Sequence, residues 1–285
     1  YGGNVIDADV QRGVGADYKD QWREIFPIVG YRVPSTDKVE VISDGSDGQA
    51  AVIRVTGSDM PTGIIKILDD LAQPLGVTIR TDYILHPDVP HLLMRTEVEN
   101  PNAAPLTEMM VGDFLAFGGA QSVFTVEGGF GGDVTNTMAM MSSGRGASYG
   151  YTVKTGTIGI PIVDASGTVG MLGTNFSVAS KGKSAFDRYL VVGDGDIASV
   201  LEDVHALRGM EVARVSGIVK DEAGKVLPGA LVTAFASGKG SPGLGGAALN
   251  QAIAGKDGTY AMTLPVGKYD LVVSAAGRLR IFKTV

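Results

Sequence analysis

Short runs of β-branched and aromatic residues, broken at close intervals by Gly, Asp, Asn and Pro, fill most of this 285-residue chain. Such runs are typical of antiparallel sandwiches and barrels, in which the breaks are turns between strands. In the first two thirds of the chain the predicted strands cover residues 39–43, 50–56, 64–68, 77–85, 92–100, 106–117, 122–126, 137–141, 147–153, 157–160, 171–179 and 184–192. The sequence therefore predicts an all-β fold.

One segment departs from this pattern and predicts a short helix near 196–208. Its apolar residues recur at helical spacing on one face, with Asp196 placed to cap the start and Gly209 to end it. The composition changes here, so we expect a domain boundary that divides the chain into residues 1–210 and 211–285. A second short helix is predicted at 18–26, where Trp22 and Phe26 are four residues apart.

The second block has its own set of short strands, predicted at 212–220, 230–236, 259–264, 269–275 and 279–284. Four motifs mark it: VSGIVKD at 215–221, GKVLPGA at 224–230, DGTY at 257–260 and LPVGKY at 264–269. With these motifs, residues 211–285 resemble the carboxypeptidase regulatory-like domain. That resemblance implies a small seven-strand transthyretin-like sandwich, in a family that is mostly non-catalytic.

The first block carries GGNVIDA at 2–8, PDVPHLLMRTEVEN at 87–100, ASYGY at 147–151 and LVVGDGDIASVL at 190–201. These strings resemble the non-catalytic N-terminal region of secreted CehA/McbA-like metallohydrolases. There a large, antiparallel, galactose-mutarotase-like supersandwich precedes a regulatory-like domain and then a PHP-type hydrolase domain. The resemblance implies a supersandwich over residues 1–210 and a secreted, periplasmic or extracellular location.

Metal-dependent hydrolysis of the PHP type needs several histidines and carboxylates around bound metal ions, typically opened by an H-x-H pair. The chain has three histidines, His86, His91 and His205, with no H-x-H pair, and no cysteine. We therefore expect no catalytic centre and no cofactor in these residues. The family resemblance would place the catalytic domain of the parent protein beyond Val285, and a first residue other than Met fits a fragment of a longer protein.

Two sets of residues remain as weak site candidates. For sugar anomerisation, which uses a carboxylate base and histidine acids, the set is His86, His91, Glu97 and Glu99. The alternative is a turn with two solvated histidines beside an exposed strand face.

For calcium, carboxylates on loops offer oxygen ligands, and the candidate residues are Asp44, Asp47, Asp194 and Asp196. The alternative there is turn formation and helix capping.

Other residues allow a structural and a functional interpretation. The glycine-rich GGFGG at 128–132 lacks the Lys and Ser/Thr of a phosphate loop, so a flexible turn is favoured. Adjacent Met140 and Met141 point to opposite faces of a strand, so core packing competes with a partner surface. Tyr149 and Tyr151 could stack on sugar rings or cap a sandwich end.

The charge and hydropathy of the chain argue against two kinds of partner, nucleic acid and a membrane. The net charge of −7 and the absence of a basic cluster argue against nucleic acid, and no run reaches the roughly 18 apolar residues of a membrane span.

Three functions follow as hypotheses. The first is a non-catalytic accessory region that contacts carbohydrate or the catalytic domain. The second is a structural subunit that self-assembles through exposed strand edges. The third is an aldose-handling enzyme of the mutarotase type.

Overall fold

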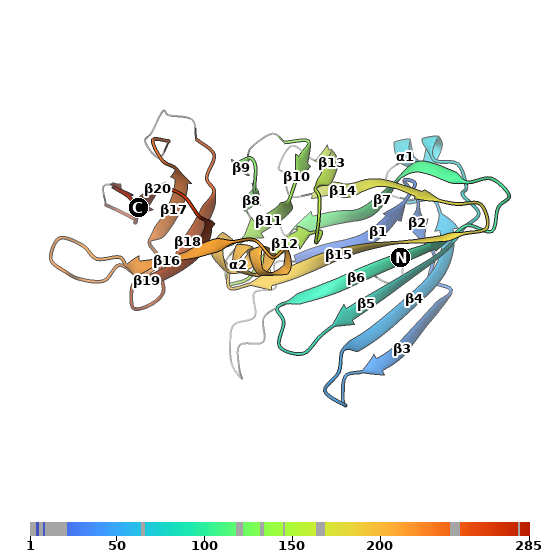
Figure 1. Cartoon of the computed structure of the whole chain (residues 1–285), viewed down its shortest axis with the longest axis horizontal. Coiled ribbons are helices and arrows are strands. Elements are labelled where there is room, and N and C mark those ends of the chain that lie inside the picture. The colour runs from blue at the N-terminus through green and yellow to red at the C-terminus, as the bar shows by residue number, and fades with distance from the viewer. Residues whose placement is uncertain are drawn as a thin grey trace. The chain divides into compact units, whose positions relative to one another are not determined.

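The computed structural model describes residues 4, 5, 8, 22–63, 66–117, 122–131, 134–144, 146–163, 169–239, 246–278 and 280–285. The described chain is mostly strand and is all-β, as the sequence predicted (Figure 1). Its contacts divide into two compact units. Unit 1 comprises Tyr1–Ala8, Trp22–Gly119 and Thr152–Leu190, and unit 2 comprises Asp9–Gln21, Ala120–Tyr151 and Val191–Val285. The predicted domain boundary near residue 210 stays a prediction.

Unit 1 contains two groups of paired strands, in the orders β1-β7-β14-β13 and β2-β4-β5-β6-β15, with β3 beside β4. The strands are β1 Trp22–Val29, β2 Val33–Pro34, β3 Lys38–Asp44, β4 Ala51–Met60, β5 Thr78–Leu85, β6 His91–Glu99, β7 Leu106–Phe117, β13 Ile158–Val163, β14 Val169–Val178 and β15 Lys183–Gly193. Strands β3 to β6 lie side by side in chain order (Figure 1). Only the last three residues of β15 belong to unit 2.

Side chains on β4, β5 and β6 alternate between a buried inner face and an outer face. Val55, Thr81 and Thr96 are opposite one another across the three strands, and all three are buried. The Thr81 and Thr96 hydroxyl oxygens are 2.9 Å apart and share a hydrogen bond. The outer face carries ion pairs instead, such as Arg54 with Asp82 at 2.7 Å. Because the side-chain period of a strand is two, this register decides which residues reach solvent.

A fully buried arginine lies in the interior of unit 1. Arg188 on β15 donates from Nε and Nη2 to the two carboxylate oxygens of Asp113 on β7, at 2.6 and 2.8 Å. Its Nη1 donates to the Met94 carbonyl and to the Thr96 hydroxyl of β6, at 2.9 and 2.6 Å. A charge can be buried when it is paired and hydrogen-bonded in this way.

Two buried glycines let β7 and β14 approach closely. Gly112 and Gly173 are directly opposite in the pairing of these strands. A Cβ atom at Gly112 would overlap the Leu172 carbonyl, and one at Gly173 would lie 2.5 Å from the Val111 carbonyl oxygen. Part of the glycine content therefore serves strand contacts inside a sheet, in addition to turns.

Unit 2 contains the strands β8 Ser122–Thr125, β9 Gly129–Phe130, β10 Asn136–Thr137, β11 Ala139–Ser143 and β12 Ser148–Thr152, of which only Thr152 falls in unit 1. The predicted helix near 196–208 is confirmed as α2, Ile197–Leu207. Asp196 caps it by accepting a hydrogen bond from the Ser199 N–H at 2.9 Å. The other carboxylate oxygen of Asp196 accepts the Ile253 N–H at 2.9 Å, so one side chain joins the helix to a distant strand.

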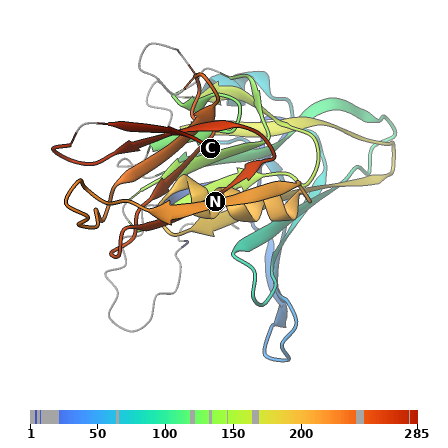
Figure 2. The ribbon, with the colours of Figure 1, turned by 60° about the vertical axis from the view of Figure 1, so that its left-hand side comes forward.

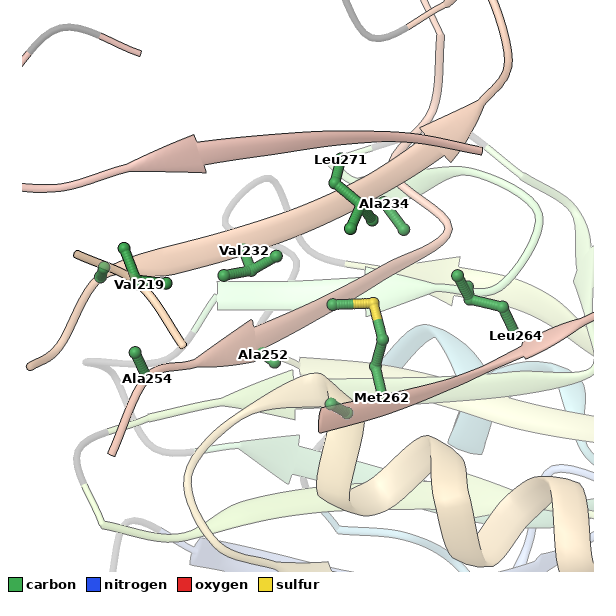
Figure 3. Close-up of a cluster of buried hydrophobic side chains, with 10 residues drawn as sticks. Val219, Val232, Ala234, Ala252, Ala254, Met262, Leu264 and Leu271 are labelled. Carbon is green, nitrogen blue, oxygen red and sulfur yellow. The ribbon is translucent and has the colours of Figure 1, made fainter. Parts of the chain in front are cut away.

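The C-terminal part of unit 2 is a small sandwich. Its described strands are β16 Val212–Ile218, β17 Leu231–Ala236, β18 Asn250–Ile253, β19 Thr259–Pro265, β20 Tyr269–Ser274 and β21 Ile281–Thr284. β16 pairs with β19, and the others follow the order β18-β17-β20-β21. Figure 3 shows the buried side chains between them, including Val232, Ala234, Met262 and Leu271. Six strands and an isolated bridge between Lys220 and Val226 are described, where the resemblance implied seven strands.

Two local predictions are wrong. The strand predicted at 64–68 is replaced by helix α1, Lys66–Leu71, and residues 64 and 65 lie outside the described chain. Asp69 accepts hydrogen bonds from Thr62 and from the Gly63 N–H, which fixes the entry to this helix. The helix predicted at 18–26 is strand β1 from Trp22 onward, because β7 pairs with it, and residues 18–21 are not described.

Burial decides between the two interpretations of the methionine and tyrosine pairs. Met140 and Met141 are both buried, so the partner-surface alternative is wrong for them. Tyr149 and Tyr151 are fully buried and are no platforms for sugar rings. Within the described part of the chain, both helices are too short to span a bilayer.

Candidate functional site

The residues predicted for sugar anomerisation are spread along β6 and the turn before it. Glu97 accepts from Arg80 at 2.9 Å, and Glu99 is 2.8 Å from the Lys183 ammonium. The hydrogen bond and the charge of Lys183 lower the pKa of Glu99. His91 is six residues before Glu97, a separation of roughly 20 Å on a strand. Both carboxylates are thus half-buried and ion-paired, and anomerisation by this set stays a prediction.

His86 and the four aspartates predicted for calcium lie in turns or at the helix start. His86 is exposed in the turn between β5 and β6. Asp44 and Asp47 each accept a backbone N–H two residues ahead, from Ser46 and Gln49, at 2.9 Å. The hydrogen bonds from Ser46 lower the pKa of Asp44. These contacts are those of turns, and calcium binding stays a prediction.

Asp194 and Asp196 are engaged at the start of α2. The Asp194 N–H donates to the Ser199 hydroxyl at 2.9 Å, and Asp196 is the helix cap described above. Among the residues that the structure describes, no three His, Asp or Glu side chains come together as metal ligands would. The glycine-rich segment 128–132 supplies β9 and a turn, with Gly132 outside the described chain.

A cavity on unit 1 brings together residues that the sequence analysis did not single out. Its volume is about 350 Å³, and three segments line it: the connection from β12 to β13, one residue of β14 and the middle of β15. The lining residues are Val153, Lys154, Thr155, Thr157, Ile158, Thr174, Ala185, Phe186, Asp187 and Tyr189. Three threonines, an aspartate, a lysine and two aromatic residues make this lining half polar and half apolar in character.

The position of Asp187 and Tyr189 follows from the strand period and from Arg188 between them. Arg188 points inward and is fixed by its four hydrogen bonds, so its two neighbours point outward. Packing and hydrogen bonding behind a site hold its residues in place. Strand β15 thus presents a carboxylate and a phenol ring, two residues apart, on a rigid support.

One oxygen of Asp187 lacks a hydrogen-bond partner. Asp187 Oδ2 is 3.4 Å from Nη1 of Arg95 on β6, a long and partly exposed ion pair. Asp187 Oδ1 is buried and accepts no hydrogen bond. A buried acceptor left unsatisfied costs free energy and calls for an explanation. A water molecule or a donor group of a bound ligand would satisfy it.

Tyr189 adds an aromatic surface to the same cavity. Its ring meets the His91 ring edge to face, with centroids 5.6 Å apart and an interplanar angle of 84°. Burial, followed by the negative charge of Asp187, raises the pKa of its phenol, so Tyr189 stays neutral at physiological pH. A neutral phenol both donates and accepts hydrogen bonds, and its ring offers an apolar face.

The lining suits the binding of a polar ligand. Among the described residues that line the cavity, the one carboxylate is paired with Arg95. Hydroxyl groups, a carboxylate acceptor and an aromatic ring are the groups that hold a polar ligand with an apolar face. The sequence signal for this site was the alternation of Ala185, Asp187 and Tyr189 on β15, but the segments that face them are distant along the chain.

The C-terminal strands have a family match. Residues 214–283 match the model of the carboxypeptidase regulatory-like domain, which confirms the resemblance of this part of the chain. No curated protein matches the chain in sequence.

Several solved structures are distantly similar. An α-galactosidase from Lactobacillus brevis has a TM-score of 0.39 and 11% identity, over 65% of this chain and 28% of that chain. A candidate aldose 1-epimerase from Klebsiella pneumoniae has a TM-score of 0.37 and 10% identity, over 62% and 58% of the two chains. A polysaccharide lyase has a TM-score of 0.36 and 10% identity, over 91% and 38%. The chain thus spans less than two thirds of each protein, and these likenesses are too distant to bear on function.

Proposed function

We propose that this chain is a non-catalytic, carbohydrate-binding region that accompanies a secreted metallohydrolase. The observation that carries the binding function is the cavity itself, whose lining combines Asp187, three threonines and Tyr189. The match of residues 214–283 to a regulatory-like domain supports the accessory role. The order of the two blocks, which resembles that of CehA/McbA-like proteins, supports the metallohydrolase context.

The chemistry of the cavity supports a neutral sugar as the ligand. The carboxylate of Asp187 can accept a hydrogen bond from a sugar hydroxyl, and Thr155, Thr157 and Thr174 lie in the same lining with groups that donate and accept. The Tyr189 ring offers a stacking surface for the apolar face of a sugar. Uronic acids would place a second carboxylate near Asp187, so neutral sugars with free hydroxyls are the expected ligands.

Binding of neutral oligosaccharides tests this function. Calorimetric titration or NMR with the full chain is expected to show binding to a member of a neutral panel. Asp187→Ala should weaken that binding at least about tenfold, because it removes a charged hydrogen-bond acceptor. Glu99→Ala is the matched control, since Glu99 is a carboxylate on the neighbouring strand whose partner is Lys183. Failure of every neutral oligosaccharide to bind, or equal binding by Asp187→Ala, contradicts the proposal.

A structural or assembly subunit is the second candidate. One observation favours it: large apolar side chains at the β3 side of unit 1 are exposed, including Val39, Val41, Ile53 and Leu85. Contiguous exposed apolar surface of this kind marks interaction sites. Oligosaccharide binding and self-association are measured separately, so each candidate can fail by itself.

A further inference from the structure

Strand β21 forms an open edge of the C-terminal sandwich. It is last in the order β18-β17-β20-β21, and it pairs with β20 alone among the strands that the structure describes. Tyr269 and Val285 exchange two backbone hydrogen bonds, of 2.9 and 2.8 Å. Because such bonded pairs recur at every second residue of an antiparallel ladder, the N–H and C=O groups of Phe282 and Thr284 point away from β20. The outer edge of β21 therefore offers backbone donors and acceptors to a further strand.

The opposite edge of the same sheet is closed by side chains. On β18 the N–H groups of Gln251 and Ile253 point away from β17. The Asn250 side chain accepts the first at 2.7 Å, and Asp196 accepts the second at 2.9 Å. Native sheets block their edges in various ways, since an open edge pairs with other chains. Of the two edges of this sheet, β21 is the one that is left open to a partner.

The side chains of β21 are open to solvent on both faces. All four residues of the strand are exposed, and Ile281 and Phe282 reach 59% and 43%. These two side chains lie on opposite faces, because successive residues of a strand alternate. Figure 2 shows the strand, in dark red, leading from the turn at the left of the view to the end of the chain marked C. A strand added at this edge would thus meet an apolar side chain on each face.

The charge of this segment is opposite to that of the whole chain. Residues 278–285 hold three basic residues and no acidic one, whereas the net charge of the chain is −7. Arg278 is paired with Asp221 at 3.2 Å. Arg280 and Lys283 are exposed and form no ion pair with any residue that the structure describes. Since they are three residues apart, they lie on opposite faces of the strand, and each face carries one unpaired cation.

The charge of β21 selects the partner. A second copy of β21 would bring the basic side chains of both chains together along one seam, which like charges disfavour. Two unpaired cations supply little of the counterion release that drives binding of a nucleic acid. The carboxylate of Asp270 on β20 is held by the Gly238 N–H and the Thr284 hydroxyl, at 2.6 and 2.8 Å. An extended peptide with carboxylates suits the open backbone, the apolar side chains and the cations together.

We propose that β21 binds an extended acidic segment of a partner protein by strand addition. The segment lies beyond β21 in the four-stranded sheet and exchanges backbone hydrogen bonds with Phe282 and Thr284. Two carboxylates on it, three residues apart, lie beside Arg280 and Lys283, and the apolar residues between them pack beside Ile281 and Phe282. The proposal uses no part of the cavity on unit 1, so it is independent of the carbohydrate site.

A synthetic peptide is the probe. The blocked heptapeptide Thr-Thr-Glu-Val-Val-Glu-Thr places two glutamates and two valines at the required spacing, and the same peptide with lysines in place of the glutamates is its control. Amide NMR of the full, isotope-labelled chain follows the titration. With the acidic peptide we expect signal changes confined to β21 and β20, and about tenfold slower deuterium exchange at Phe282 and Thr284 at saturation. The lysine peptide should produce neither change.

Phe282→Pro tests the backbone contacts. It removes an N–H that points away from β20, so the ladder inside the sandwich keeps its hydrogen bonds while the added strand loses one. Phe282→Ala is the matched control, because it removes the ring and keeps the N–H. The proline variant should bind the acidic peptide at least about fivefold more weakly than the alanine variant does. Equal melting temperatures of the two variants show that the fold is intact.

Lys283→Glu tests the charge without touching the backbone. It should weaken binding of the acidic peptide by roughly threefold and strengthen binding of the lysine peptide, as expected for an exposed ion pair. Lys256→Glu makes the same change at the exposed turn between β18 and β19, and it should alter neither affinity.

Four results would overturn the proposal. The first is that the acidic peptide does not bind, or binds no better than the lysine peptide. The second is equal affinity of Phe282→Pro and Phe282→Ala. The third is an equal response to a ten-residue oligothymidylate, which would show a general anion site. The fourth is a change of the Phe282 and Thr284 amides with protein concentration alone, which would show that a second copy takes the edge.

Discussion

The interiors of the two units are built from different chemistry. Unit 1 holds a fully buried Arg188–Asp113 ion pair and a second, nearly buried pair of Arg32 with Asp59 at 2.6 Å. The C-terminal sandwich of unit 2 is packed with small apolar side chains (Figure 3). Its buried polar contacts are neutral, as between His205 and Thr263. The stability of the first interior depends on complete pairing of its buried charges. The stability of the second depends on how well apolar side chains fill its volume.

This difference reflects what each interior has to join. In unit 1 one guanidinium contacts β6 and β7 from β15, so a long side chain with several donors is needed. In unit 2 the short helix α2 lies between two apolar clusters. Ala198 packs in the cluster of the C-terminal sandwich, while Val200 and Leu201 pack with Phe124 and Met141 of β8 and β11. Apolar packing, together with the hydrogen bond of Asp196 to the Ile253 N–H, joins those elements.

The largest effect is expected from breaking the buried ion pair. Asp113→Ala leaves the Arg188 guanidinium buried without its counter-charge and should lower the free energy of unfolding by about 3–5 kcal/mol. Denaturant unfolding, with the slope checked for two-state behaviour, measures it. The matched control is Asp82→Ala, whose partner Arg54 is partly exposed, and it should cost about 1 kcal/mol or less.

A double variant tests whether the loss of stability comes from the unpaired charge. Arg188→Met with Asp113→Leu removes both charges and should recover a large part of the loss, because apolar groups can replace a buried pair. If the double variant were as unstable as Asp113→Ala, the hydrogen bonds of Arg188 to Met94 and Thr96 would outweigh the charge effect.

An intermediate effect is expected in unit 2. Leu201→Ala removes a buried side chain of α2 and leaves a cavity in the cluster with Phe124 and Met141, at a cost of about 3 kcal/mol. Leu207→Ala, at the half-buried end of the same helix, should cost clearly less. Equal losses in the two variants would contradict cavity volume as the cause, because Ala is the better helix former at both positions.

The smallest effect concerns pH. Burial lowers the pKa of His205 from its usual 6.5, so above that pH the imidazole is neutral in both folded and unfolded chains. As the pH falls below 6.5 the unfolded chain takes up the proton more readily, and stability decreases. His205→Gln should reduce the drop in melting temperature between about pH 7.5 and 5.5. The exposed His86→Gln is the control, and a drop unchanged in His205→Gln would contradict the assignment.

Much of the fold could be predicted from the strand pattern and the turns. The strands around 106–117 and the helix with its Asp196 cap follow from local signals in the sequence. The errors have physical causes. The apolar run at 64–68 looks like a strand, but Thr62 and Gly63 bind Asp69 and start a helix. Trp22 and Phe26 have helical spacing, but pairing with β7 overrides it.

The candidate site was much harder to predict. Asp187 and Tyr189 could be placed on one face of β15 by alternation, yet nothing local marks them as part of a cavity. The cavity forms only because Thr174 and the connection from β12 to β13 come to lie beside β15. The predicted histidines and glutamates are close in sequence, but the extended strand β6 holds His91 at one end, far from Glu97 and Glu99 at the other.

Asp196 has a consequence for how unit 2 folds. One carboxylate oxygen caps α2 and the other binds the Ile253 backbone, 57 residues further along the chain. Neither the helix start nor strand β18 is complete without the other, so the two should form and open together as one cooperative unit. Amide hydrogens of α2 and of β17–β18 should accordingly exchange with deuterium at a common slow rate, although they belong to segments on either side of residue 210.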